Sequence, residues 1–247
     1  MLSLLTSKAG VVAGVLVLLL VAERLFPASR LRHGVAGLIK NFSLGSLNLV
    51  MGPLLVLPLS AFAAAHALGL RPAWWGMALD LVLMDGWIYG WHRINHVVPL
   101  FWRFHEVHHL DETLDTSTAL RFHFGEVVLS ALARAGLVWL FGIPLATVLV
   151  FETVVVAATL FHHSNMRLPA RLEWALAFVV VTPSIHWVHH HARRADTDSN
   201  YATVLSVWDR LFGTRSGTLR GPAMAIGVEG EKDRGFVQLL LRPLVGR

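Results

Sequence analysis

Residues 85–109 read DGWIYGWHRINHVVPLFWRFHEVHH, in which an apolar segment gives way to a run of histidines. In an α-helix, residues three or four apart lie on one face, so His92 and His96 are expected to place their rings together. Imidazole is a ligand suited to zinc, copper, iron and nickel. The segment therefore predicts an apolar helix that ends in a metal-binding face.

Twelve of the fourteen histidines lie between residues 92 and 191 and fall into groups. The groups are His92 and His96; His105, His108 and His109; His123; His162 and His163; and His186, His189, His190 and His191. The spacing His-x-x-His-His occurs twice. Packing so many titratable rings beside a membrane is costly unless a metal or hydrogen bonds compensate. We expect a metal centre, and eight to ten imidazoles suit two ions rather than one. The two remaining histidines, His33 and His66, are expected to be structural.

The composition favours a membrane protein. Of the 247 residues, 55% are hydrophobic and only 15% are charged, whereas soluble domains carry about 25% charged residues. The chain has no cysteine, which excludes disulfides, iron–sulfur clusters and thiolate ligands. The net charge of +5 comes mostly from arginines that form no basic block with interleaved aromatic residues. We therefore expect no nucleic-acid partner.

Several apolar regions approach or exceed the roughly 20 residues of helix that cross a bilayer. They are Val11–Phe26, Leu44–Leu70, Ala73–Trp91, and a hairpin over 127–161 that breaks at Phe141-Gly-Ile-Pro144. Pro53 and Pro58 predict kinks in the second region. A signal peptide is the alternative for the first, and Trp174–Val181 is expected to be interfacial or buried. The sequence thus predicts an all-α, integral-membrane bundle of about four to five transmembrane helices.

The distribution of positive charge predicts the orientation of the bundle. Basic residues crowd the connection after the first apolar region, which places that connection in the cytoplasm; they are Arg24, Arg30, Arg32 and Lys40. From there, the order of the spans brings residue 92 and the end of the 127–161 hairpin to the same side. All histidine groups are therefore expected at one cytoplasmic face. The small size and the Ala/Leu/Val/Arg-rich composition favour a bacterial inner membrane.

Carboxylates near the histidines are candidates for orienting the rings, because a metal-bound histidine usually donates its second N–H to an oxygen. Asp85 precedes His92 by seven residues and shares its helical face. Glu126 follows His123 by three residues, and Asp198 is a further candidate.

Two other readings of the histidines remain open. His105-Glu106-Val-His-His109 matches the pattern of zinc proteases, in which Glu106 is the general base. That reading leaves about seven clustered histidines without a role. A membrane metal-binding or transport protein is the second alternative, but its ligands are expected along a path through the spans. In this sequence the clustered histidines come after the apolar spans and are not distributed along them.

The ordered motifs resemble those of the fatty acid hydroxylase / sterol desaturase superfamily, from about residue 85 to residue 214. The matching elements are Asp85-x-x-x-Tyr89-x-Trp91-His92-Arg93-x-x-His96, Pro99-x-x-Trp102-x-x-His105-x-x-His108-His109, Thr118-Ala-Leu-Arg121-x-His123-x-x-Glu126, Phe161-x-His163-Ser-Asn165, Pro183-x-x-His186-x-x-His189-His190, Asn200-Tyr201 and Asp209-x-x-Phe212-Gly213-Thr214. We expect N-terminal transmembrane helices over 1–84, a catalytic domain over 85–215 that includes the hairpin, and a C-terminal tail over 216–247.

The resemblance implies a membrane-bound, non-haem di-iron oxygenase that hydroxylates or desaturates a lipid. It implies O2 as co-substrate and a separate electron donor, ferredoxin- or cytochrome b5-like, with its reductase. The metal ligands that it implies are His92, His96, His105, His108, His109, His123, His163, His186, His189 and His190. The sequence departs from the family at Phe124, where a proline is usual after the Arg-x-His element, and His162 and His191 are extra histidines beside motif positions.

Overall fold

The computed structural model describes residues 2–30, 33–72 and 74–245; Arg32 and Ala73, which entered the predictions above, lie outside them. Its described secondary structure is helical, with isolated β-bridges and no β-strand, as predicted. The helices are α1 (Leu2–Leu25), α2 (Val35–Met51), the π-turn η1 (Gly52–Val56), α3 (Leu57–Ala65), α4 (Met77–Val97), α5 (Pro99–His109), the 3₁₀ turn η2 (Thr116–Leu120), α6 (Phe124–Phe141), α7 (Leu145–His163), α8 (Ala170–Ala177), α9 (Pro183–His189), α10 (Arg194–Thr197), α11 (Val207–Leu211) and α12 (Phe236–Leu241).

Four helical stretches in the described residues are long and apolar enough to cross a membrane: Leu5–Leu25, Val35–Ala65, Phe124–Phe141 and Leu145–His163. The predicted integral-membrane helical bundle is confirmed. The second stretch runs through α2, η1 and α3 as one helix, and Pro53 lies in its π-turn. A proline removes one backbone hydrogen bond, and a π-turn is one way in which a helix accommodates that loss.

The predicted span Ala73–Trp91 corresponds to α4, which is not among the four stretches. This helix carries Asp80, Asp85 and Arg93, and both carboxylates are buried inside the protein. Met84 of α4 is fully buried in a cluster with Val138 of α6 and Phe151 of α7. The helix is therefore held by its neighbours in the bundle, and its hydropathy alone does not mark it as a span.

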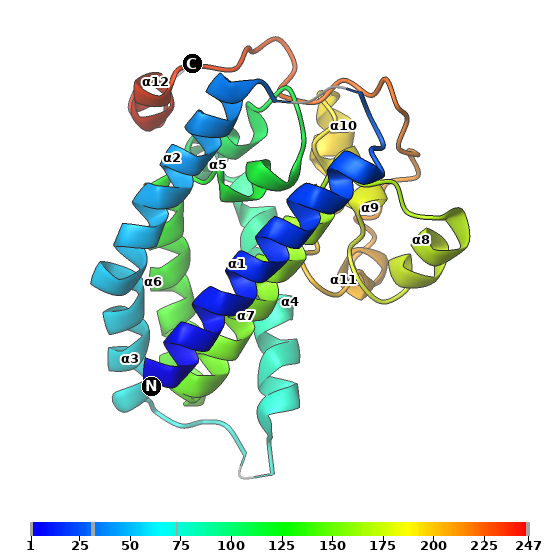
Figure 1. Cartoon of the computed structure of the whole chain (residues 1–247). Coiled ribbons are helices and arrows are strands. Elements are labelled where there is room, and N and C mark those ends of the chain that lie inside the picture. The colour runs from blue at the N-terminus through cyan, green and yellow to red at the C-terminus, as the bar shows by residue number, and fades with distance from the viewer. Residues whose placement is uncertain (1, 31–32, 73, 246–247) are drawn as a thin grey trace.

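The chain termini and the turns between the long helices lie at the two opposite ends of the bundle (Figure 1). The N-terminus, the α3–α4 connection and the α6–α7 turn lie at one end; Leu68 N–H donates to the Trp139 carbonyl there (2.8 Å). Gly142 has φ +73°, and a Cβ at this position would lie 3.0 Å from the Gly69 Cα, so this contact requires glycine. All the histidine groups emerge at the opposite end.

A buried carboxylate joins α1 to the histidine end. Glu23 is 2% exposed and accepts hydrogen bonds from the Thr116 N–H (2.9 Å), the Thr116 hydroxyl (2.7 Å) and the Asn165 N–H (3.0 Å). Three segments that are distant in the chain therefore meet at the end of the first span.

The segment predicted as a C-terminal tail, residues 216–247, packs against the rest of the protein over its described part. Leu239 of α12 is buried with Leu44, Val107 and Leu110. Gly227 N–H donates to the His190 carbonyl (3.1 Å). This segment therefore contacts both α5 and the end of α9, the two helices with the His-x-x-His-His spacing.

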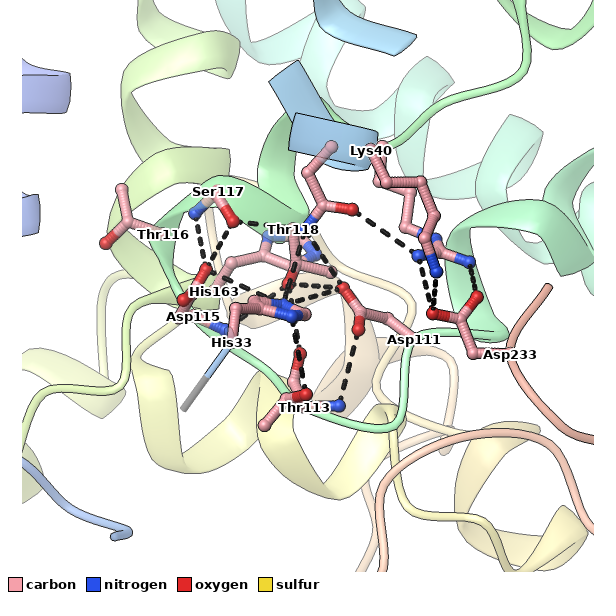
Figure 2. Close-up of polar contacts among 12 residues, drawn as sticks. His33, Lys40, Asp111, Thr113, Asp115, Thr116, Ser117, Thr118, His163 and Asp233 are labelled. Carbon is pink, nitrogen blue, oxygen red and sulfur yellow. Dashed lines mark hydrogen bonds and ion pairs between the residues drawn. The ribbon is translucent and has the colours of Figure 1, made fainter. Parts of the chain in front are cut away.

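Polar side chains also hold the C-terminal segment, as Figure 2 shows for Asp233 and Lys40. Asp233 of the C-terminal segment pairs with Lys40 and with the fully buried Arg121. His33 lies 3.1 Å from the Asp111 carboxylate, so it has the polar partners of a structural histidine, as predicted.

Candidate metal centre

Nine histidines, from α4, α5, α7 and the α9 region, form two adjoining groups of side chains that can hold a metal ion. Group 1 consists of His92, His96, His105, His109 and His189, and group 2 of His108, His163, His186 and His190. Within each group, the candidate ligand atoms lie within 4.8 Å of one another. The rings of His109 and His190 stack at a centroid distance of 4.3 Å, so the two groups are neighbours.

The two His-x-x-His-His segments divide their histidines between the two groups in opposite ways. In α5, the first and last histidines, His105 and His109, belong to group 1, and His108 belongs to group 2. In the α9 segment, the first and last, His186 and His190, belong to group 2, and His189 belongs to group 1. Adjacent residues of a helix point about 100° apart, so His108 and His109 point in different directions, as do His189 and His190. Each segment therefore serves both groups.

Nitrogen atoms converge in both groups. The His105 Nε2 lies 3.1 Å from that of His92 and 3.2 Å from that of His109. In group 2, the His163 Nε2 lies 2.9 Å from that of His108 and 3.1 Å from that of His186. Two imidazole nitrogens bound at right angles to an ion at about 2.1 Å are roughly 3.0 Å apart. The observed spacings therefore fit nitrogens that share a metal ion.

Hydrogen bonds on the far side of four rings orient their Nε2 atoms toward the groups. Nδ1 of His92 donates to the Tyr201 carbonyl (2.7 Å), that of His189 to the Ser199 carbonyl (2.6 Å), and that of His163 to the Thr159 carbonyl (2.7 Å). The His105 Nδ1 donates to the Glu126 carboxylate (2.7 Å). Such bonds fix the tautomer that leaves Nε2 with a free lone pair. The donor set thus fits two ions held by neutral nitrogen.

Burial favours this neutral state. Eight of the nine rings are at most 2% exposed, and His92 is half-buried. Burial, followed by the neighbouring histidines, holds the pKa of His109 and His190 well below the ordinary value. Burial lowers the pKa of His189 to about 3. The rings are therefore ready to bind metal at neutral pH without losing a proton first.

We expect the metal-free protein to lose stability when the pH falls below about 6.5. The unfolded chain binds protons at its histidines near that pH, whereas the folded chain binds one at His189 only near pH 3. Each such histidine contributes stability that is full above pH 6.5 and decreases by about 1.4 kcal/mol per pH unit on acidification. Unfolding of the metal-free protein in detergent, measured between pH 5 and pH 8, checks this; a flat profile contradicts it.

His123 is the one predicted ligand that the structure does not bring to either group. Its Nδ1 accepts from the Gly125 N–H (2.9 Å) and thereby caps α6, while its Nε2 donates to the Leu240 carbonyl (3.1 Å). Both nitrogens are therefore engaged elsewhere. Of the extra histidines, His162 is buried with its ring centroid 3.9 Å from that of His186 but belongs to neither group. His191 contacts Asp196 (2.9 Å).

The three predicted carboxylates differ in what they contact. Glu126 binds His105 and also accepts from the Asn95 amide (3.2 Å). Asp198 lies 3.5 Å from the Nδ1 of His96. Asp85 does not contact His92: it accepts from the Leu205 N–H (3.1 Å) and the Trp208 indole N–H (2.7 Å).

Sequence reasoning missed the backbone carbonyls that orient the rings. The Asn200-Tyr201 element was the available signal, because its Tyr201 carbonyl holds His92. The sequence also gave no indication of the ion pair of Glu106, which is buried and pairs with Arg242 (2.8 Å). That ion pair links α5 to the end of α12.

The sequence is similar to a family of known proteins and to several of its characterised relatives. A family model described as fatty acid hydroxylase matches residues 77–214. The chain is 31% identical over 176 residues to an ornithine lipid hydroxylase, OlsE, of Rhizobium tropici, a match that covers 70% of this chain and 52% of the relative. It is 35% identical over 136 residues to alkylglycerol monooxygenase of Homo sapiens (53% and 28%), and 27% identical over 168 residues to cholesterol 25-hydroxylase of Rattus norvegicus (63% and 51%).

These matches span about half the length of the relatives or less. No solved structure matches the chain.

Proposed function

The chain belongs to the fatty acid hydroxylase family, and on that premise we propose that it is a membrane-bound, non-haem di-iron oxygenase that hydroxylates or desaturates a lipid. O2 is the proposed co-substrate, and a separate protein the proposed electron donor. The observation that carries the proposal is the pair of adjoining all-histidine groups at one end of an apolar helical bundle.

The proposed ligands are the nine histidines of groups 1 and 2, one iron ion for each group. Iron held by these nitrogens supplies the activation of O2 and the oxidising power needed to break an unactivated C–H bond. The chain's own part is to hold the ions and to keep water out. Burial of eight rings and the contact of the C-terminal segment with His190 support that role.

We propose that the substrate reaches group 1 from the bilayer along an aromatic stack. Trp87 and Trp91 lie parallel at a centroid distance of 6.1 Å, and Trp91 lies 5.2 Å from Phe101. Trp91 precedes His92, the one half-buried member of the two groups. Flat apolar side chains in the second half of α4 and the first turn of α5 suit a hydrocarbon chain, and aromatic residues favour the membrane interface.

The substrate class follows from the relatives, which are named for an ornithine lipid, alkylglycerols and cholesterol. A membrane lipid with a polar headgroup and a long hydrocarbon portion is the proposed substrate. Arginines gather at the histidine end, and we place this end in the cytoplasm of a bacterial inner membrane on the strength of that charge.

The alternatives are less well supported. In a zinc protease, Glu106 would act as a general base, but here Arg242 engages its carboxylate. In a transporter, the ligands are expected along the spans, whereas both groups lie at one end of the bundle.

Lipid profiling under ¹⁸O2 tests the proposal. Cells that express the protein are expected to contain a lipid heavier by one labelled oxygen atom, or one that has lost two hydrogens. Cells that express His105→Ala, which lacks the central ring of group 1, are expected to contain neither. Identical lipid profiles in the two strains, with both proteins present in the membrane and the first one loaded with iron, would contradict the proposed function.

A further inference from the structure

Two short helices at the histidine end, α8 and α11, carry an exposed apolar surface together with the residues that follow them. Its largest members are between 46% and 67% exposed: Leu172, Trp174, Phe178, Val179, Leu211 and Phe212. We call these six residues the α8–α11 ledge. In Figure 1, α8 projects sideways from the bundle at the histidine end. Neither helix belongs to the four stretches that are long and apolar enough to cross a membrane.

Hydrogen bonds hold the two helices together and attach them to the bundle. The guanidinium of Arg210 in α11 donates to the carbonyls of Ala177 (3.2 Å) and Phe178 (2.6 Å) at the end of α8. The indole N–H of Trp208, also in α11, donates to the buried Asp85 carboxylate of α4 (2.7 Å). The height of the ledge is therefore fixed relative to the long helices.

The ledge begins where two of the membrane-spanning stretches end. The first stretch ends at Leu25 and the fourth at His163. Beside these ends, the Arg167 N–H donates to the Phe26 carbonyl (2.7 Å), and α8 begins three residues after Arg167. The side chains of Leu25 and Phe26 are exposed, as those of lipid-facing residues are. α8 therefore starts at the level at which the spans leave the apolar core of the bilayer.

The side chains of α8 suit a helix that lies in the plane of the membrane interface. Arg171, Trp174 and Phe178 share one helical face, and the Trp174 and Phe178 rings are in contact at a centroid distance of 4.7 Å. Tryptophan favours the headgroup level, and an arginine beside it extends to the lipid phosphates. No carboxylate of the described residues forms an ion pair with Arg167 or Arg171, and both are exposed. Lipid phosphates would neutralise these charges, whereas a second copy of this face would bring more positive charge.

We propose that the α8–α11 ledge is inserted in the interfacial region of the bilayer leaflet at the histidine end. Its apolar side chains lie at the boundary between headgroups and acyl chains, with Arg167 and Arg171 at the level of the phosphates. α11 also supplies Asp209, which accepts from the Tyr201 N–H (2.8 Å), and the Tyr201 carbonyl orients His92. The bilayer contact therefore sets the height of group 1 above this leaflet.

A single fluorophore on the ledge tests this placement, because the chain has no cysteine and an introduced one is the only labelling site. Trp174→Cys and Leu211→Cys report on the ledge. Leu18→Cys, exposed in the first membrane-spanning stretch, is the lipid control, and Lys232→Cys, with 88% of its side chain exposed, is the water control.

Each metal-loaded variant is labelled with the fluorophore NBD and placed in phosphatidylcholine/phosphatidylglycerol nanodiscs that hold either one chain or two. The quenchers are a phosphatidylcholine with a nitroxide near the headgroup, one with a nitroxide near the end of the acyl chain, and aqueous iodide. The labels at positions 174 and 211 are expected to lie about 5–10 Å into the boundary between headgroups and acyl chains. The nitroxide near the headgroup should therefore quench them more strongly than the deeper one, and iodide should quench them less than the label at position 232. The label at position 18 is expected to be quenched by both lipids.

Iodide quenching as strong at positions 174 and 211 as at position 232 would overturn the proposal, because the ledge would then face water. Protection from iodide and from both lipids that occurs only with two chains in a nanodisc would also overturn it, and would assign the ledge to contact between copies. No lipid is oxidised in these measurements, so either result leaves the proposed oxygenase function unaffected.

Discussion

Replacement of His186 by alanine is expected to leave one tightly bound metal ion instead of two and to lower lipid oxidation more than about 100-fold. The Nε2 of His186 lies 3.1 Å from that of His163 and 3.1 Å from that of His190, so its ring connects these two members of group 2. Loss of the residues that merely orient metal-bound histidines already costs about 10–100-fold. Metal content after anaerobic purification and product formation measure the effect.

His123→Ala is the matched control for that change. It removes a histidine of the same motif block whose nitrogens bind Gly125 and Leu240 instead of facing either group. We expect it to keep both metal ions and to cost about 1 kcal/mol of stability, because an N-cap of α6 is lost. If the His123 variant lost a metal ion, or if the His186 variant kept two, the division into groups 1 and 2 would be wrong.

Nine of the ten ligands that the family resemblance implies lie in the two groups, and helical periodicity accounts for the local pairs among them. Spacings of three and four residues place rings near one another within a helix whatever the tertiary fold, as His92 and His96 show. The same rule cannot say how helices face each other. The exchange of roles between α5 and α9, with His108 and His189 crossing to the other group, is therefore visible only in the structure.

The partners of the rings were less predictable because most come from distant parts of the chain. Asp85 shares a helical face with His92 in the sequence, yet the Tyr201 carbonyl holds that ring. Asp85 is instead occupied by Leu205 and Trp208, which follow the last histidine segment. A backbone carbonyl has no sequence signature, since every residue carries one.

The helical bundle was predictable from the apolar runs of the sequence. The same argument explains where that prediction falls short. α4 carries two buried carboxylates, so hydropathy understates how firmly its neighbours hold it. The C-terminal segment has no apolar run long enough to cross a membrane, and its charged residues led us to predict a basic tail. The segment is held by the buried Leu239 and by ion pairs to α2, α5 and the end of η2. No local sequence pattern predicts these contacts.

Those ion pairs lead to the second large expected effect: Asp233→Ala is expected to lower the free energy of unfolding by about 3–5 kcal/mol. Arg121 is fully buried, and Asp233 is the carboxylate that pairs with its guanidinium. Arg121 also donates from its Nε to the Val107 carbonyl of α5 (2.9 Å), between Glu106 and His108. Removal of Asp233 leaves a charge buried without its partner beside a helix that supplies three proposed ligands.

Glu112→Gln tests whether the loss comes from burial or from charge alone. Glu112 pairs with Lys232 (3.1 Å), the residue next to Asp233, but both side chains are exposed. Exposed pairs of this kind contribute about 0–1 kcal/mol, so this variant is expected to unfold almost as the unchanged protein does. Denaturant or thermal unfolding in detergent, with metal content measured on the same samples, compares the two. Equal stability losses in the two variants would contradict the role assigned to Asp233, whereas a large loss in Asp233→Ala with metal release would show that the C-terminal segment stabilises the metal centre through Arg121 and α5.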